Sequence, residues 1–108
     1  MANFDDFWKT LKTGLEELAL KNWKDVKDAA VADGQAFLAK TKADLERWTQ
    51  LLGTGALTRD DFEWLVAGKK DLAEMQALEK AGLSLIRLER FQNALISLVI
   101  DTAFNTFA

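Results

Sequence analysis

The sequence predicts an all-α protein built from two long helical halves joined by one short turn. The 108 residues include no proline, the usual helix breaker, while helix-favouring residues such as Ala, Leu, Lys and Glu are common. Apolar residues recur at steps of three and four along both halves. Only residues 53-57 combine a clear helix stop with an immediate restart. We therefore expect a single domain, 1-108, divided into helical halves at 3-52 and 58-107.

The first half, 3-52, is predicted to be one helix. Asn3 can cap it, with Asp5 and Asp6 in the first turn. The apolar or small residues of its stripe are Phe4, Trp8, Leu11, Leu15, Leu18, Val26, Ala30, Gly34, Phe37, Thr41, Leu45, Trp48 and Leu52. Gly34 is the obvious position for a break, yet the stripe keeps its phase there and a helical glycine costs only about 1 kcal/mol. We expect continuity, with any bend at Gly34.

The turn at 53-57 has separate signals for its two sides. Gly53 can supply the left-handed residue that ends a helix, and Gly55 adds a second freely bending position. Thr58 is placed to cap the next helix by accepting a hydrogen bond from the amide of Asp61.

The second half, 58-107, has weaker signals for where a helix ends or begins. Gly68 and Gly82 are possible interruptions, and Ser84 could cap a new helix after Gly82. Neither glycine carries a full turn signature, so we expect the helix to continue through both.

Residues 83-107 are apolar around most of the helix circumference, which one partner helix cannot cover. Two helices of about 48 residues would each be about 70 Å long. We therefore expect an antiparallel helical hairpin that pairs with a second copy into a four-helix bundle. The expected interface consists of Leu88, Phe91, Leu95, Leu98, Val99 and Phe104. The alternative is a compact monomeric four-helix bundle with breaks near Gly34 and Gly82.

A narrow polar line crosses this apolar segment and is the candidate polar site: Arg90, Asn93, Ser97 and Asp101. Asp101 follows an apolar run, so burial could raise its pKa and let it bind a proton or ligand. Exposure on the polar line, or pairing with a basic residue, is the ordinary alternative. Arg87 and Arg90 could clamp an anion, or could be solvated.

The four tryptophans divide into two pairs. Trp8 and Trp48 lie on the apolar stripe, which indicates core positions, whereas Trp23 and Trp64 lie off it and are better candidates for an interface.

Composition narrows the function. The sequence has no cysteine and no histidine, so it lacks a thiolate nucleophile, the commonest metal ligand and the commonest neutral-pH proton shuttle. Its net charge of -3 and scattered basic residues argue against a nucleic-acid surface. An enzyme would need carboxylates and lysines gathered across helices, which no motif identifies. We expect no catalytic residue, no cofactor and no metal site.

These observations favour a non-enzymatic helical protein-interaction or scaffold module that self-associates through its apolar C-terminal helix. The alternative is a peripheral lipid- or apolar-ligand-binding helical protein. We expect a homo-oligomer, with a dimer favoured, and a protein partner whose identity the sequence does not give. We expect neither nucleic-acid binding nor membrane contact, and a cytoplasmic location, because the acidic start Met-Ala-Asn-Phe-Asp-Asp lacks the order of a secretory signal.

Overall fold

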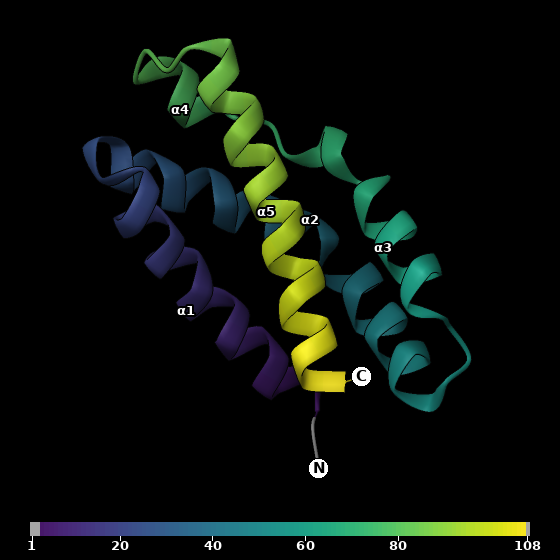
Figure 1. Cartoon of the computed structure of the whole chain (residues 1–108). Coiled ribbons are helices and arrows are strands. Elements are labelled where there is room, and N and C mark those ends of the chain that lie inside the picture. Colours follow the sequence, from purple (N-terminus) through teal and green to yellow (C-terminus); the bar gives the residue numbers. More distant parts are fainter. Residues whose placement is uncertain (1–2, 108) are drawn as a thin grey trace.

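The computed structural model of the chain describes residues 3–107, and every regular element within that range is helical. The predicted all-α class is confirmed. The elements follow one another as α1 (Phe4–Asn22), η1 (Lys24–Val26), α2 (Lys27–Thr54), α3 (Arg59–Ala67), η2 (Lys70–Leu72), α4 (Gln76–Lys80) and α5 (Leu85–Phe107), where η denotes a short 3₁₀ turn (Figure 1).

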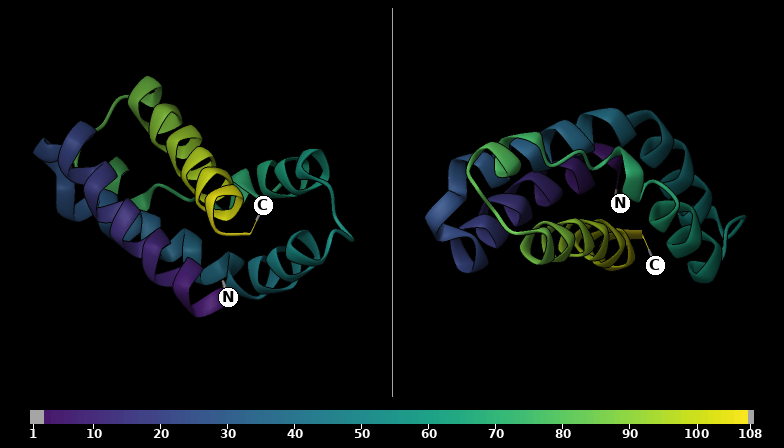
Figure 2. Two further views of the ribbon diagram at one scale, coloured as in Figure 1. Left: turned by 60° about the horizontal axis from the view of Figure 1, so that its bottom comes forward. Right: turned by 90° about the horizontal axis from the view of Figure 1, so that it is seen from above.

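Helix α5 is the central element. It lies between α1 and α3, with α2 passing behind it, and contacts all three (Figures 1 and 2). The fold measures 43 × 23 × 19 Å with a radius of gyration of 13.7 Å, close to the roughly 13 Å typical of a compact domain of this length. From Leu88 onward, most apolar side chains of α5 are thus covered within one chain, as the compact alternative expected.

Neither half is the continuous helix that the sequence predicts. The first half breaks at Trp23, whose backbone (φ -131°, ψ 39°) leaves the helical region and ends α1. The Trp23 side chain is only 7% exposed and packs edge-on against Phe91 of α5, with ring centroids 5.0 Å apart. This aromatic contact stabilises the turn at Trp23, although the position carries no glycine or proline.

Gly34, where a bend was expected, lies inside α2 and contacts α1. A Cβ atom at this position would lie 2.4 Å from one methyl carbon of Leu15 in α1 and 2.8 Å from the other. Because Leu15 is fully buried, its side chain has little room to move away. The missing side chain of Gly34 therefore lets α1 and α2 approach closely, and the break near Gly34 that the compact alternative required does not occur.

The restart after α2 is confirmed, with one correction. The hydroxyl of Thr58 accepts a hydrogen bond of 3.1 Å from the amide of Asp61, and Asn3 caps α1 in the same way through the amide of Asp6 at 2.9 Å. The left-handed residue that ends α2 is Gly55, with φ 82°, whereas Gly53 remains helical. The stop thus lies two residues later than predicted.

The second half contains three helices. Helix α3 is capped at its end by Gly68, and an irregular segment with η2 leads to the short helix α4. After α4 the chain turns at Gly82, whose φ of 87° favours glycine. The hydroxyl of Ser84 then accepts from the amide of Arg87 at the start of α5. The expectation of continuity through Gly68 and Gly82 is therefore wrong, and the alternative break near Gly82 is right.

A buried carboxylate positions α4. Asp33 of α2 is 5% exposed, and its two oxygens accept hydrogen bonds from the amides of Ala77 (3.0 Å) and Leu78 (2.8 Å). These amides belong to the first turn of α4, where backbone donors have no partner within the helix. Asp33 thus acts as an N-terminal cap supplied from 44 residues away.

Replacing this cap should destabilise the protein. We expect Asp33→Ala to lower the free energy of unfolding by about 2–3 kcal/mol, because it leaves two amide donors in or near the core without an acceptor. Asp33→Asn, which retains one acceptor oxygen, should lose less. Urea unfolding followed by circular dichroism measures both, and Gln35→Ala, at an exposed position of the same helix, is the matched control. Equal stability of Asp33→Ala and the control would contradict the capping role.

Candidate functional site

The expected interface residues of α5 belong to the core of the single chain. Phe91, Leu95 and Val99 are fully buried, and Leu88 is nearly so. Leu98 and Phe104 are half-buried, and the Phe104 ring packs 5.9 Å from that of Phe62 in α3. Sequence periodicity identified these side chains as apolar and buried, but the helices that cover them are α1, α2 and α3 of the same molecule.

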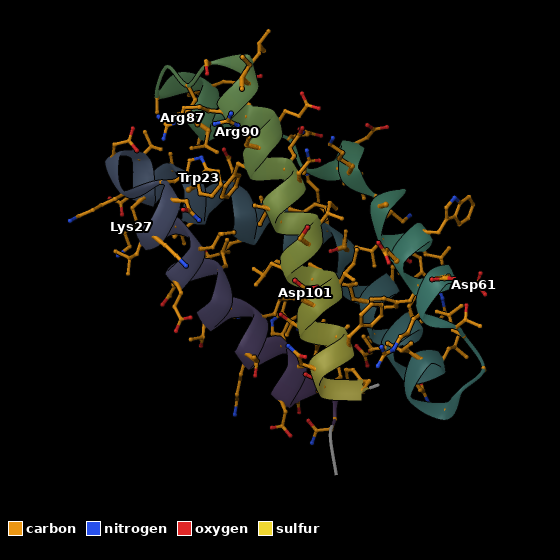
Figure 3. The ribbon with its side chains drawn as sticks, in the orientation of Figure 1. Trp23, Lys27, Asp61, Arg87, Arg90 and Asp101 are labelled. Carbon is orange, nitrogen blue, oxygen red and sulfur yellow. The ribbon has the colours of Figure 1, made fainter. Side chains whose placement is uncertain are left out.

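The four residues of the polar line do not gather at one place in the fold. Arg90, Asn93, Ser97 and Asp101 are all exposed along α5, and they are spread over three helical turns, or about 16 Å. Figure 3 shows Arg90 and Asp101 well apart on this helix. Asp101 is therefore a solvated carboxylate, and the four residues do not converge on one point.

Arg87 is engaged inside the molecule. Its guanidinium donates two hydrogen bonds to the carboxylate of Asp25 in η1, at 2.9 and 3.0 Å. The hydrogen bonds from Arg87, helped by its positive charge, hold the pKa of Asp25 below its usual value, and the pKa of Arg87 is raised in return. This pair connects the first turn of α5 to the break after α1. It also occupies one member of the expected Arg87–Arg90 anion clamp.

The four tryptophans differ in how far they are buried. Trp48 is buried and Trp8 is half-buried on the predicted stripe. Of the two interface candidates, Trp23 is buried against Phe91 (Figure 3), so that prediction is wrong for Trp23. Trp64, on α3, is 76% exposed.

The Trp64 groove is the depression beside this exposed ring. It has a volume of about 510 Å³ and is lined by Trp48, Trp64, Leu65, Ala67, Gly68 and Lys69. The ammonium of Lys69 lies 5.8 Å from the centre of the Trp48 ring and 3.3 Å from a carboxylate oxygen of Asp44. The groove therefore combines aromatic surface, which is enriched at protein interfaces, with a cation at its edge.

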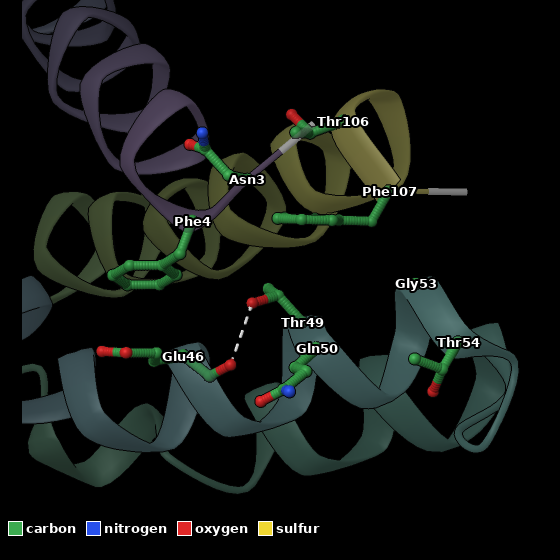
Figure 4. A pocket seen from close by; sticks show the side chains of 9 residues that line it. All are labelled: Asn3, Phe4, Glu46, Thr49, Gln50, Gly53, Thr54, Thr106 and Phe107. Atoms are coloured by element: carbon green, nitrogen blue, oxygen red, sulfur yellow. Dashed lines mark hydrogen bonds between the residues drawn. The ribbon is translucent and has the colours of Figure 1, made fainter. Parts of the chain in front are cut away.

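A second depression, the terminal pocket, lies where the first turn of α1, the last turns of α2 and the end of α5 meet (Figure 4). Its volume is about 470 Å³, within the range of small-molecule sites. The rings of Phe4 and Phe107 line it, together with the carboxylate of Glu46. The hydroxyls of Thr49 and Thr106 also line it but donate to backbone carbonyls of their own helices, at 2.7 and 2.8 Å. The pocket thus offers mainly apolar and aromatic surface.

Sequence reasoning missed the terminal pocket. Phe4 and Phe107 stand near opposite ends of the chain, and no spacing rule relates them. They line one pocket because α1 and α5 pack side by side with the start of one near the end of the other (Figure 1).

Comparison with protein-family models, with curated proteins and with solved structures finds no match to this chain. Within residues 3–107 no helix has both the length and the apolar character needed to cross a membrane. The same residues contain no group of three or more acidic side chains placed to hold a metal ion.

The Asp25–Arg87 pair predicts a pH dependence. Because the pKa of Asp25 is lowered by folding, the pair stabilises the protein at neutral pH, and this contribution is lost as the pH falls through the lowered pKa. Arg87→Gln should raise the pKa of Asp25 towards its ordinary value, measured by NMR titration of the side-chain carboxyl. Arg90→Gln, one turn further along α5, should leave that pKa unchanged. An unchanged pKa in Arg87→Gln would contradict the pairing.

Proposed function

We propose that the protein is a non-enzymatic, cytoplasmic helical interaction module that self-associates as a dimer through the surface of α3 centred on Trp64. The observation that carries the proposal is the 76% exposure of Trp64 beside the Trp64 groove. Tryptophan is among the side chains most enriched at the energetic centres of protein interfaces. The expected interface residues of α5 are buried or half-buried within the single chain, so the proposed interface moves from α5 to α3.

The arrangement of charge on α3 supports pairing with a second copy. Asp60 and Asp61 lie in the first turn of α3, and Lys69 follows its end. A two-fold axis near the middle of α3 sets two copies of the helix antiparallel, which brings these carboxylates close to the partner's Lys69. Each Trp64, next to the midpoint of the helix, then faces the groove of the other copy. One surface thus pairs with itself, as a two-fold dimer requires.

The apolar contact supplies the affinity in this arrangement. A tryptophan side chain buries about 150–250 Å² when it is covered, and each Å² of apolar surface removed from water contributes about 25 cal/mol. Two such side chains bury a large apolar area at the centre of the interface, while the exposed charges mainly set its register.

Removing the indole should break the dimer. We expect Trp64→Ala to raise the dimer dissociation constant at least about tenfold, measured by sedimentation equilibrium. Leu20→Ala, at an exposed leucine of α1, is the matched control and should leave the constant unchanged. Asp61→Lys should weaken the dimer, and adding Lys69→Asp should restore part of the loss. A wild-type protein that is monomeric at every accessible concentration would refute self-association.

The terminal pocket favours a second candidate function, the binding of a small apolar ligand. Its two phenylalanine rings and its volume suit an aromatic or aliphatic molecule. Because the hydroxyls of Thr49 and Thr106 are already bonded to the backbone, the two rings are the main contact surface.

This candidate has its own test, the fluorescence of the neutral apolar dye N-phenylnaphthylamine. A Cβ atom at Gly53 would meet only a ring carbon of Phe107, at an ordinary 3.6 Å, so a side chain can begin there without a clash at its first carbon. Gly53→Leu fills the pocket and should abolish the dye signal, while Gln35→Leu, an exposed position outside the pocket, should not. Equal dye binding by both variants would exclude the pocket as the site.

A further inference from the structure

A second exposed apolar site lies where α4 joins α5. Leu85 is 82% exposed and Ile86 is 66% exposed, in the first turn of α5. Leu85 borders a depression of about 460 Å³ between the start of α5 and the segment 71–79, here named the α4–α5 groove. Figure 1 shows α4 and the start of α5 together at one end of the molecule, whereas α3 lies along its side. The groove is therefore separate from the Trp64 groove.

The floor of the α4–α5 groove is apolar and fixed. Ala73, Met75 and Leu88 line it and are buried. The side-chain amide of Gln92 donates a 2.8 Å hydrogen bond to the carbonyl of Ala73, which ties this irregular segment to α5. Methionine is unbranched and polarisable, so Met75 can adapt to different apolar side chains of a ligand.

The rim of the groove is acidic. Asp71, Glu74, Glu79 and Glu89 line it, and no lysine or arginine does. Two of these carboxylates have nearby cations: Lys40 lies 3.4 Å from Glu74, and Lys70 lies 3.9 Å from Glu89. Within residues 3–107, neither Asp71 nor Glu79 takes part in a salt bridge. The groove therefore keeps a net negative charge around an exposed leucine.

We infer that the α4–α5 groove binds a basic amphipathic helix of a partner protein. The apolar side of that helix would cover Leu85 and the floor, and its lysines or arginines would face the four rim carboxylates. An extended peptide that binds by strand addition would need an unpaired strand edge, and residues 3–107 contain no strand. Helix-in-groove recognition needs an apolar contact with side-chain charges around it, which the exposed Leu85 and the four rim carboxylates supply.

The charge of the rim identifies the partner's chemistry. Ion pairs at an exposed rim raise the association rate and select the partner's charge, while the apolar anchor supplies most of the affinity. An acidic helix would place like charges against Asp71 and Glu79 and would be rejected. A partner with both apolar and basic character is therefore the one that the groove fits.

The test uses a synthetic amphipathic helix of leucine and lysine, labelled with fluorescein, and its counterpart with glutamate in place of lysine. We expect the lysine peptide to bind the full chain, with an affinity that falls as salt is raised, and the glutamate peptide not to bind. Fluorescence anisotropy measures both. Asp71→Lys combined with Glu79→Lys, and separately Leu85→Ser, should each weaken binding of the lysine peptide about tenfold or more.

Controls separate this site from general attraction to an acidic protein. Glu17→Lys combined with Asp101→Lys makes the same change in net charge at exposed positions outside the groove, and should leave the affinity within about twofold. Trp64→Ala should also bind normally, so failure of the proposed dimer does not decide this result. All substituted positions are exposed, and circular dichroism verifies that each variant is folded.

Three outcomes would overturn the inference. One is equal weakening by the control pair and the groove pair, which would show attraction without a site. Another is normal binding by Leu85→Ser, which would remove the apolar anchor from the mechanism. The third is a wild-type oligomer that dissociates in the Asp71→Lys and Glu79→Lys variant, because a second copy would then be the occupant of the groove.

Discussion

The pair of hydrogen bonds from the amides of α4 to the Asp33 carboxylate is the interaction on which the second half of the chain depends. A helix of five residues is too short to be stable alone, because nucleation costs more than so few backbone bonds return. Asp33 offsets part of that cost by accepting from two amides that would otherwise lack partners. Once α4 is held against α2, the turn at Gly82 and the start of α5 follow within a few residues. The α4–α5 groove exists because this short helix has a fixed place.

The next residue, Gly34, holds the other side of the same helical turn. Its missing side chain admits both methyl groups of Leu15, so α1 packs directly on the backbone of α2. Adjacent residues on a helix point about 100° apart, which lets Asp33 face α4 while Gly34 faces α1. Substitution of either residue therefore disturbs a different neighbour, one by removing a charge-assisted hydrogen bond and the other by overfilling a close contact. One turn of α2 thus positions two other helices.

The helix caps at Asn3 and Thr58 were predicted correctly, whereas the features that depend on long-range contacts were not. The caps at Asn3 and Thr58 are formed between residues three apart, so their spacing alone predicted them. The break at Trp23 depends on a contact with Phe91, 68 positions further along, and the cap at α4 depends on Asp33, so neither has a local pattern. Gly34 was predicted as the site of any bend because glycine is conformationally free, yet its role is to give space to Leu15. The expected interface residues of α5 are apolar because they are buried, as predicted, but the helices that cover them come from the same chain. The terminal pocket and both grooves depend on this packing, which periodicity does not reveal.

The long helices form most of the core, and the short elements carry or border the most exposed apolar side chains. Helices α1, α2 and α5 supply most of the buried side chains, whereas α3 and the segment around α4 contribute few. Trp64 lies on α3, and Leu85 lies just after α4, so the two most exposed large apolar side chains in residues 3–107 belong to or border the short elements. Short helices with few buried contacts open locally at lower cost than the frame does. A partner that binds only the ordered form of such an element stabilises it by mass action. Binding of the proposed partners at either surface would therefore stabilise α3 or α4, while the α1–α2–α5 core keeps both surfaces in place.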